Sequence, residues 1–116
     1  ANPPNRKPSA WIEAVREQLE AVHTEPPTLE ELATQAGVHP VHLSREFRKQ
    51  FGVTPSEFLR RRRIEQASEQ LAHSDRSLCE IALEAGFYDQ SHFTNAFKRQ
   101  MGMTPTAYRA LFDFHQ

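Results

Sequence analysis

At the centre of the chain lies the stretch Thr54-Pro-Ser-Glu-Phe-Leu-Arg-Arg-Arg-Arg-Ile-Glu-Gln-Ala-Ser-Glu-Gln-Leu-Ala-His73. Thr54 followed by Glu57 has the pattern of a capping box, and Pro55 occupies a first helical position, where its missing N–H costs nothing. No glycine or further proline interrupts the run before Ser74. The pattern therefore predicts one helix of about 19 residues, roughly 28 Å long at about 1.5 Å per residue.

The apolar residues of this predicted helix change face along its length. Phe58 and Leu59 lie on one side, whereas Ile64 and Leu71 lie on another. A helix whose apolar stripe changes face packs against two different bodies, one at each end. We therefore expect a linker helix over about 54–73 between two packing units.

The segments on either side of this helix are copies of each other. A shift of 49 places the first set on the second: Leu29, Glu31, Ala33, Ala36 and Gly37 on Leu78, Glu80, Ala82, Ala85 and Gly86. From Leu43 onward a shift of 50 does the same: Phe47, Gln50, Gly52, Thr54 and Pro55 fall on Phe97, Gln100, Gly102, Thr104 and Pro105. The inserted residue falls in a turn, where it is easily accommodated. Identity at caps, helix ends and core positions indicates one supersecondary unit that occurs twice.

Each copy has the pattern of a short helix, a tight turn and a longer helix, which is a helix-turn-helix. The first unit covers about 28–52 and opens with the capping-box pair Thr28 and Glu31, while the second covers about 77–102 and opens with the capping-box pair Ser77 and Glu80. A first helix beginning near Ser9 and a closing helix over about 104–115 complete the pattern, and the proline-rich residues 1–8 predict a tail or linker. We therefore expect an all-α domain over 9–116 with seven helices.

Composition excludes several classes of function. Cys79 is the only cysteine, so the chain has neither an intramolecular disulfide nor a cysteine-based metal cluster, and we expect this thiol to be partly buried and inert. The six histidines show no ligand spacing, so we expect no metal site and no cofactor. No apolar run approaches the ~18 residues of a membrane span, and we expect a soluble, cytoplasmic protein.

Charge is segregated although the net charge is only −1. Residues 9–35 hold six glutamates against one arginine, whereas residues 39–63 hold seven basic residues against two glutamates. A locally basic middle is a candidate anion-binding surface, and a merely solvated face is the alternative. Within the arginine run, we expect Arg60 and Arg63 to have structural roles, with their stems packed and their charges paired with glutamates, and Arg61 and Arg62 to be exposed.

The outward face of each longer helix follows from about 100° of rotation per residue. With Leu43 inward, the residues opposite or flanking are Val41, Ser44, Arg45, Arg48 and Lys49. With Phe93 inward, they are Ser91, Thr94, Asn95, Lys98 and Arg99, with Gln90 at the exposed start. Arginine suits the guanine edge, asparagine and glutamine suit adenine, and valine can touch a thymine methyl. The alternative is that these are ordinary solvated helix faces. That alternative would account well for one such helix but poorly for both together, so the pattern favours DNA reading.

The predicted linker suits the same function. Two recognition helices that enter successive major grooves from one side need a separation of roughly 34 Å. A helix of about 28 Å plus the widths of the packed units comes near that length. Two units on one chain require no dyad, so the expected site is asymmetric.

A long motif gives this reading a family. The stretch Gly86-Phe-Tyr-Asp-Gln-Ser-His-Phe-Thr-Asn-Ala-Phe-Lys-Arg-Gln-Met-Gly-Met-Thr-Pro-Thr-Ala-Tyr-Arg109 closely resembles the signature of the AraC/XylS family of bacterial transcription regulators. The resemblance covers about residues 9–112. It implies two helix-turn-helix units joined by a long helix, sequence-specific promoter binding and, usually, activation through RNA polymerase. The family normally joins this module to an effector-binding or dimerisation domain, which we expect to be missing from this chain.

The resemblance also assigns roles by position. The base-reading positions are Val41, Ser44 and Arg45 in the first unit and Gln90, Ser91, Thr94 and Asn95 in the second, with His92 beside them. Val41 departs from the larger or polar residues often found at its position. Because they share faces with these readers, the candidates for phosphate contacts are Arg48, Lys49, Lys98 and Arg99.

Two other classes of function remain as alternatives. A protein-interaction module that uses the acidic first helix and has lost DNA binding would show negligible retention on DNA at low salt. An enzyme would need a nucleophilic or phosphate-binding constellation, and the chain has no such motif. A DNA-repair relative that joins this fold to a nucleophilic cysteine would need a cysteine in a separate reactive setting, which Cys79 does not provide. We therefore expect no enzymatic activity.

Overall fold

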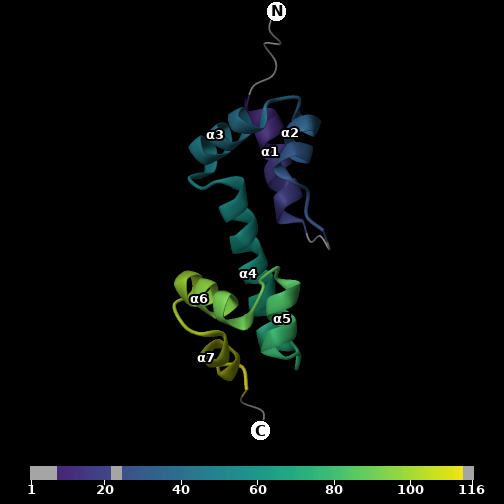
Figure 1. The fold of residues 1–116 in the computed structure, drawn as a ribbon. Helices are drawn as coiled ribbons and strands as arrows, with labels where there is room; N and C mark the ends of the chain where they lie inside the picture. The colour runs from purple at the N-terminus through teal and green to yellow at the C-terminus, as the bar shows by residue number, and fades with distance from the viewer. Residues whose placement is uncertain (1–7, 22–24, 114–116) are drawn as a thin grey trace, which may run out of the picture. The chain divides into compact units, whose positions relative to one another are not determined.

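The computed structural model describes residues 8–21 and 25–113, and it places seven helices and no strand in them (Figure 1). The helices are α1 (Pro8–Glu20), α2 (Leu29–Ala36), α3 (Pro40–Phe51), α4 (Pro55–His73), α5 (Leu78–Glu84), α6 (Gln90–Met101) and α7 (Pro105–Ala110). The predicted all-α fold of seven helices is confirmed.

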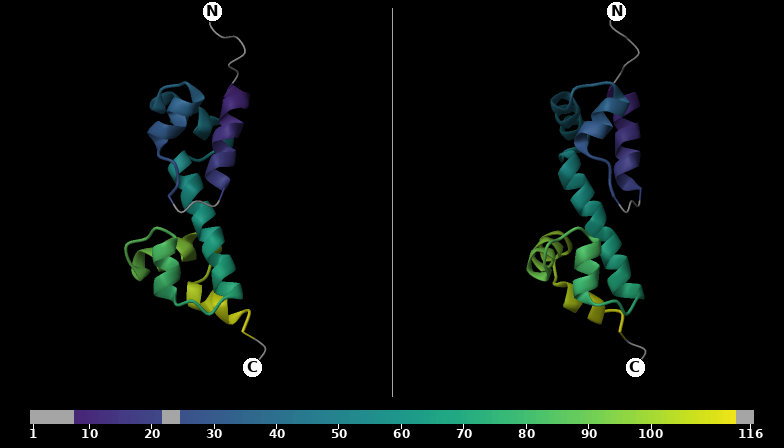
Figure 2. Two further views of the ribbon diagram at one scale, coloured as in Figure 1. Left: turned by 90° about the vertical axis from the view of Figure 1, so that its right-hand side faces the viewer. Right: turned by 45° about the vertical axis from the view of Figure 1, so that its right-hand side comes forward.

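The chain divides into two compact units, Ala1–Leu59 and Arg60–Gln116, and the long helix α4 contributes to both. The first core consists of the buried residues Trp11, Ile12, Val15, Leu19, Leu32, Ala33, Leu43 and Phe47. The second consists of Ile64, Ala67, Leu71, Ile81, Ala82, Ala85, Phe93, Ala96 and Phe97. Figure 2 shows the helices of each unit beside the part of α4 that belongs to that unit.

The change of face along α4 has the predicted consequence. Phe58 and Leu59 pack, partly buried, against the first core. Ile64 and Leu71 are fully buried in the second core. One continuous helix therefore supplies apolar side chains to two separate cores, and the change occurs between Leu59 and Arg60.

Local hydrogen bonds determine where the helices begin. Each capping box is reciprocal: the backbone N–H of Glu31 donates to Thr28 Oγ1 at 3.1 Å, and the backbone N–H of Thr28 donates to Glu31 Oε1 at 2.8 Å. The pairs Thr54–Glu57 and Ser77–Glu80 form the same two bonds. In the last pair the backbone N–H and then the hydroxyl of Ser77 donate to the carboxylate, which lowers the pKa of Glu80. The three predicted capping boxes are confirmed.

The two copies are also buried alike. Over Phe51 to Arg60 and Met101 to Ala110 the sequence of buried, half-buried and exposed residues is the same at every position. Gly52 and Gly102 end the longer helices with φ of 82° and 86°, a left-handed conformation that glycine adopts without strain. The repeat that the sequence predicts is therefore a repeat of structure.

Arg109 distinguishes the second unit from the first. Its Nε donates to the carbonyl oxygen of Leu71 and its Nη2 to that of Ser74, both at 3.1 Å. These carbonyls lie at the carboxyl end of α4, where helix carbonyls have no partner within the helix. The equivalent residue in the first unit is Leu59, which packs partly buried against its core. A charged side chain thus ties α7 to α4 in the second unit.

Some predicted bounds differ from those observed. The first helix begins at Pro8, so Ser9 lies inside its first turn instead of capping it. The last helix ends at Ala110 and not near residue 115. The N–H groups of the next three residues bond to carbonyls three residues back instead of four. Asp113 would also place a negative charge at the carboxyl end of a longer helix, where it is unfavourable. The predicted tail, apart from Pro8, and residues 114 and 115 of the predicted closing helix lie outside the described residues.

Replacing Arg109 by alanine removes both donors from the end of α4. We expect the free energy of unfolding to fall by about 1.5–3 kcal/mol, the range for hydrogen bonds made by a charged group. Urea denaturation followed by far-UV circular dichroism measures the change. As a control, Arg60→Ala removes an exposed arginine from α4 itself, and this change should lower the free energy of unfolding by less than about 0.5 kcal/mol. Equal losses for the two variants would contradict a capping role for Arg109.

Candidate nucleic-acid interface

The inward face of α3 and of α6 determines which side chains are free to meet a partner. Leu43 and Phe47 on α3, and Phe93 and Phe97 on α6, have no solvent exposure. In each unit the shorter helix, α2 or α5, packs against the longer one, which completes a helix-turn-helix. The opposite side of each longer helix therefore faces solvent.

The outward face of α3 carries the residues that the sequence predicts. Val41 is 56% exposed, so a side chain without a polar atom faces solvent here. Arg45, Arg48 and Lys49 are exposed as well, and Ser44 is half-buried between this face and the core. One helix face thus presents an apolar contact, a bidentate donor and two further cations.

The outward face of α6 repeats this order. All but one of its predicted residues are exposed: Gln90, Ser91, His92, Asn95, Lys98 and Arg99. The exception, Thr94, is half-buried, as is its counterpart Ser44. The equivalent pairs are Ser44 and Thr94, Arg45 and Asn95, Arg48 and Lys98, and Lys49 and Arg99. We call these two sets the α3 face and the α6 face.

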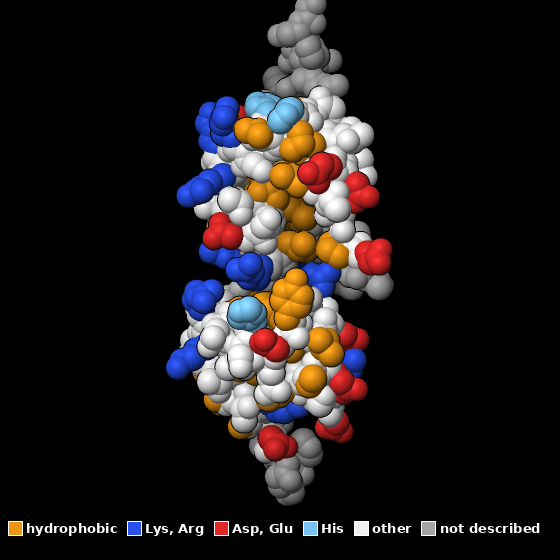
Figure 3. All heavy atoms as spheres, viewed as in Figure 1, with side chains coloured by type: hydrophobic (Ala, Val, Ile, Leu, Met, Phe, Trp, Pro, Cys, Tyr) orange, Lys and Arg blue, Asp and Glu red, His pale blue; other side chains and the backbone are white. Residues whose placement is uncertain are grey.

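The cations of the two faces are not committed to carboxylates. Among the described residues, the arginines in ion pairs are Arg16, Arg62 and Arg76. None of the cations on the α3 and α6 faces forms such a pair within the described part of the chain: Arg45, Arg48, Lys49, Lys98 and Arg99. Figure 3 shows lysine and arginine along the side of each unit where α3 or α6 lies in Figure 1. These charges are available to an anionic partner.

Side-chain caps fix the first turn of each face. At the start of α3, the backbone N–H of Val41 donates to Nδ1 of His39 at 3.1 Å, so His39 caps this helix. At the start of α6, the backbone N–H of His92 donates to Oδ1 of Asp89 at 2.8 Å. Each cap holds the amino-terminal turn, from which a recognition helix contacts base edges.

The arginine run of α4 is divided between structure and solvent. Nη1 of Arg63 donates to the carbonyl oxygen of Glu84 at 3.0 Å, so its predicted structural role is confirmed, although its partner is a backbone carbonyl and not a carboxylate. The prediction for Arg60 and Arg62 is wrong, because Arg60 is exposed while Arg62 is half-buried and pairs with Glu65. Arg61 is exposed as expected. The run lies where α4 changes partner, so helical phase alone assigns these positions poorly.

The exposure of two residues was not predicted from the sequence. Cys79 is exposed instead of partly buried, because Ile81 and Ala82 take the inward positions of the short helix α5. Tyr88, which the sequence analysis did not single out, is 91% exposed immediately before the cap of α6. The signal that could have identified it is the inserted residue in the second turn.

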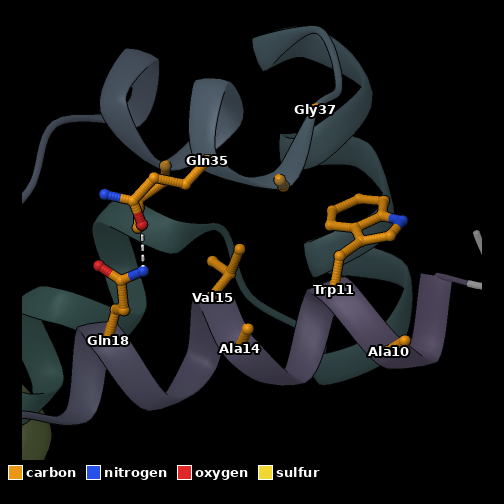
Figure 4. Close-up of a pocket in the computed structure, with 9 residues that line it drawn as sticks. Ala10, Trp11, Ala14, Val15, Gln18, Gln35 and Gly37 are labelled. Carbon is orange, nitrogen blue, oxygen red and sulfur yellow. Dashed lines mark hydrogen bonds between the residues drawn. The ribbon is translucent and has the colours of Figure 1, made fainter.

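One groove of about 470 Å³ lies between α1 and α2 (Figure 4). Trp11, Ala14 and Val15 line it from α1, and near one end Nε2 of Gln18 donates to Oε1 of Gln35. None of the residues of the α3 and α6 faces lines it. Within the described residues no group of three or more histidine, cysteine or acidic side chains could hold a metal, and no helix is long and apolar enough to cross a membrane.

Comparison with known proteins agrees with this architecture. Residues 32–111 match the family described as a helix-turn-helix domain. The chain is 31% identical over 103 residues to the bifunctional transcriptional activator and DNA repair enzyme AdaA of Bacillus subtilis, covering 89% of this chain and 49% of AdaA. It is 34% identical over 100 residues to the transcriptional activator RhaR of Klebsiella pneumoniae, covering 86% of this chain and 36% of RhaR. The chain therefore spans half or less of the length of these two relatives.

A solved structure extends the comparison to DNA. The DNA-binding domain of the global transcriptional factor AdpA, in complex with a target DNA, matches with a TM-score of 0.69 and 32% identity, covering 90% of each chain. The fold and the sequence therefore agree. The chain has two helix-turn-helix units, a shared long helix and exposed basic faces on α3 and α6, and most of its sequence is similar to that of these proteins. The chain belongs to the AraC/XylS family of bacterial transcription regulators and carries its helix-turn-helix DNA-binding domain.

Proposed function

We propose that this DNA-binding domain reads one asymmetric promoter site with both units, α3 entering one major groove and α6 the next. The observation that carries the proposal is the pair of matching outward faces, each with exposed side chains suited to base edges followed by cations. A major groove admits one α-helix, and its base edges present a unique pattern of donors and acceptors. Two helix-turn-helix units on one chain read two half-sites that need not be related by a dyad.

The side chains on the two faces suit different bases. Arg45 has the planar fork that binds guanine O6 and N7, whereas Asn95 and Gln90 suit adenine N6 and N7. Val41 has the apolar surface to contact a thymine methyl, and Ser44 and Thr94 are hydroxyl groups that accept or donate. Ser91 and His92 complete the exposed first turn of α6. Because equivalent positions carry different residues, the two units should prefer different half-sites.

The cations at the far end of each face are proposed to bind phosphates. Arg48 and Lys49 lie in the last turn of α3, and Lys98 and Arg99 lie in the last turn of α6. Contacts of this kind position a helix on the duplex and carry no base preference of their own. They should provide most of the salt dependence of binding.

In the whole protein we propose that DNA binding serves activation through RNA polymerase, in the bacterial cytoplasm. RhaR and AdaA are both described as transcriptional activators, and both are much longer than the matched region. Their extra length supports an effector-binding or dimerisation domain joined to this one in the complete regulator.

We also propose that this domain has no enzymatic activity, although AdaA is bifunctional. A repair reaction would need a nucleophile in a reactive setting, such as a thiol beside a cation or a base. Cys79 is exposed on α5 and takes the position that Glu30 occupies in the first unit. Its counterpart is thus an ordinary surface residue.

Selection of bound sites from random duplexes tests the proposed function directly. We expect a two-part, asymmetric site of roughly 20 base pairs. A strictly palindromic site would count against the proposal that the two helix-turn-helix units of one chain read one site. Negligible retention of any duplex at low salt would favour the alternative of a protein-interaction module, because non-specific phosphate binding should persist in any DNA-binding member.

Replacing Arg45 by alanine should remove a base contact of the first unit. We expect specific binding to weaken by about 1–3 kcal/mol and the preference at one base pair to relax. Titration of the selected site and of its single-base variants measures both effects. Arg61→Ala, which removes an exposed arginine from α4 outside both faces, should change neither. If Arg45→Ala weakened binding to random and selected duplexes equally, its assigned role would be wrong.

Replacing Lys98 by alanine should instead remove a phosphate contact. We expect weaker binding to every sequence, and a plot of log affinity against log salt concentration that is shallower by about one unit. Lys98→Arg keeps the charge and should restore the slope. A loss restricted to the selected site, or an unchanged slope, would contradict the phosphate assignment.

A further inference from the structure

The turns of the two helix-turn-helix units differ by one residue. The two turns begin alike, directly after α2 and α5. The backbone N–H of Val38 donates to the carbonyl of Ala33 at 3.0 Å, and that of Phe87 donates to the carbonyl of Ala82 at 3.1 Å. At their other ends the caps are His39 and Asp89. The first unit has no residue between Val38 and its cap, whereas the second has Tyr88. Tyr88 is therefore the residue that the second turn adds.

The side chain of Tyr88 contributes nothing to the core of its unit. It is 91% exposed, whereas the other large hydrophobic residues that the structure describes as exposed, Val41, Leu83 and Leu111, are 56–57% exposed. Its neighbours are fixed on both sides: Phe87 packs against Phe93 with ring centroids 5.6 Å apart, and Asp89 caps α6. An amphipathic phenol thus lies in solvent on an anchored backbone, where both its ring and its hydroxyl are accessible to a partner.

The position of Tyr88 relative to α6 indicates the contact. Gln90 and Ser91, the first residues of the α6 face, follow directly after the Asp89 cap. When the amino-terminal turn of a recognition helix meets base edges, the residues just before it lie at the rim of the groove, where the sugar–phosphate backbone passes. A tyrosine hydroxyl is an uncharged donor that phosphate oxygens accept, and its ring can cover a deoxyribose.

We propose that Tyr88 is a DNA-backbone contact of the second unit: its hydroxyl donates to a phosphate oxygen while its ring lies against the adjoining sugar. The proposal rests on the proposed function, and it adds a contact that the first unit does not possess. A backbone contact immediately before α6 would fix the depth and register of that helix in its groove without reading a base.

Two substitutions separate the hydroxyl from the ring. Tyr88→Phe should weaken binding about fivefold, the effect of losing one hydrogen bond. Tyr88→Ala should weaken it about twentyfold, because the ring contact is lost as well. Both losses should be the same on the selected site and on random duplex. Because tyrosine carries no charge and displaces no counterion, the salt slope should stay that of the unsubstituted chain, unlike that of Lys98→Ala.

Leu83→Ala is the matched control, since it removes another exposed apolar side chain from the same unit and should leave DNA affinity unchanged. Far-UV circular dichroism should show the same helix content and melting for all three variants, because these side chains are exposed. Unchanged affinity in Tyr88→Ala, or a loss restricted to the selected site, would overturn the backbone contact. An equal loss in Leu83→Ala would overturn it too.

The controls also separate this inference from the function on which it rests. If the unsubstituted chain binds DNA and Arg45→Ala loses specificity while Tyr88→Ala binds normally, only the Tyr88 contact is wrong. If the unsubstituted chain retains no duplex at low salt, the proposed function itself fails.

Discussion

The structure depends on the burial of one apolar face on each longer helix. Phe47 on α3 and Phe97 on α6 are both fully buried at equivalent positions. Burying a side chain of this size contributes about 1.5–3 kcal/mol, so rotation of either helix about its axis would be costly. Holding that face inward is what holds the opposite face outward. The core of each unit therefore determines which residues a duplex could meet, although no core residue would touch it.

The same logic reassigns the basic residues. The four arginines of α4 form the most concentrated charge in the sequence, yet Arg62 pairs with Glu65 and Arg63 binds the carbonyl of Glu84. The cations of the α3 and α6 faces are fewer per turn but uncommitted within the described residues. What makes a positive charge useful to a phosphate is its freedom from an internal partner, and charge density in the sequence does not measure that.

Differences between the copies carry as much information as their likeness. Identical burial from Phe51 to Arg60 and from Met101 to Ala110 shows that the scaffold is shared. Two positions differ within this shared scaffold. Where the first unit has Leu59, the second has Arg109, which binds carbonyls at the end of α4, and the second turn has the additional exposed residue Tyr88. A substitution that would be unremarkable in a single unit becomes interpretable because its counterpart gives the expected environment.

The sequence alone determined the presence of the helices, the capping boxes, the repeat and the outward faces, because each depends on residues within a few positions of one another: Thr28 with Glu31, or Leu43 with Phe47. Only the tertiary structure decided the contacts that close each fold, such as Gln100 with the carbonyl of Arg61, 39 residues apart, and Arg109 with that of Leu71, 38 residues apart. It also decided the exposure of Cys79 and Tyr88 and the division of the arginine run. Helical phase gives a residue's direction, but burial depends on which neighbour lies in that direction, and that neighbour is brought there by distant parts of the chain.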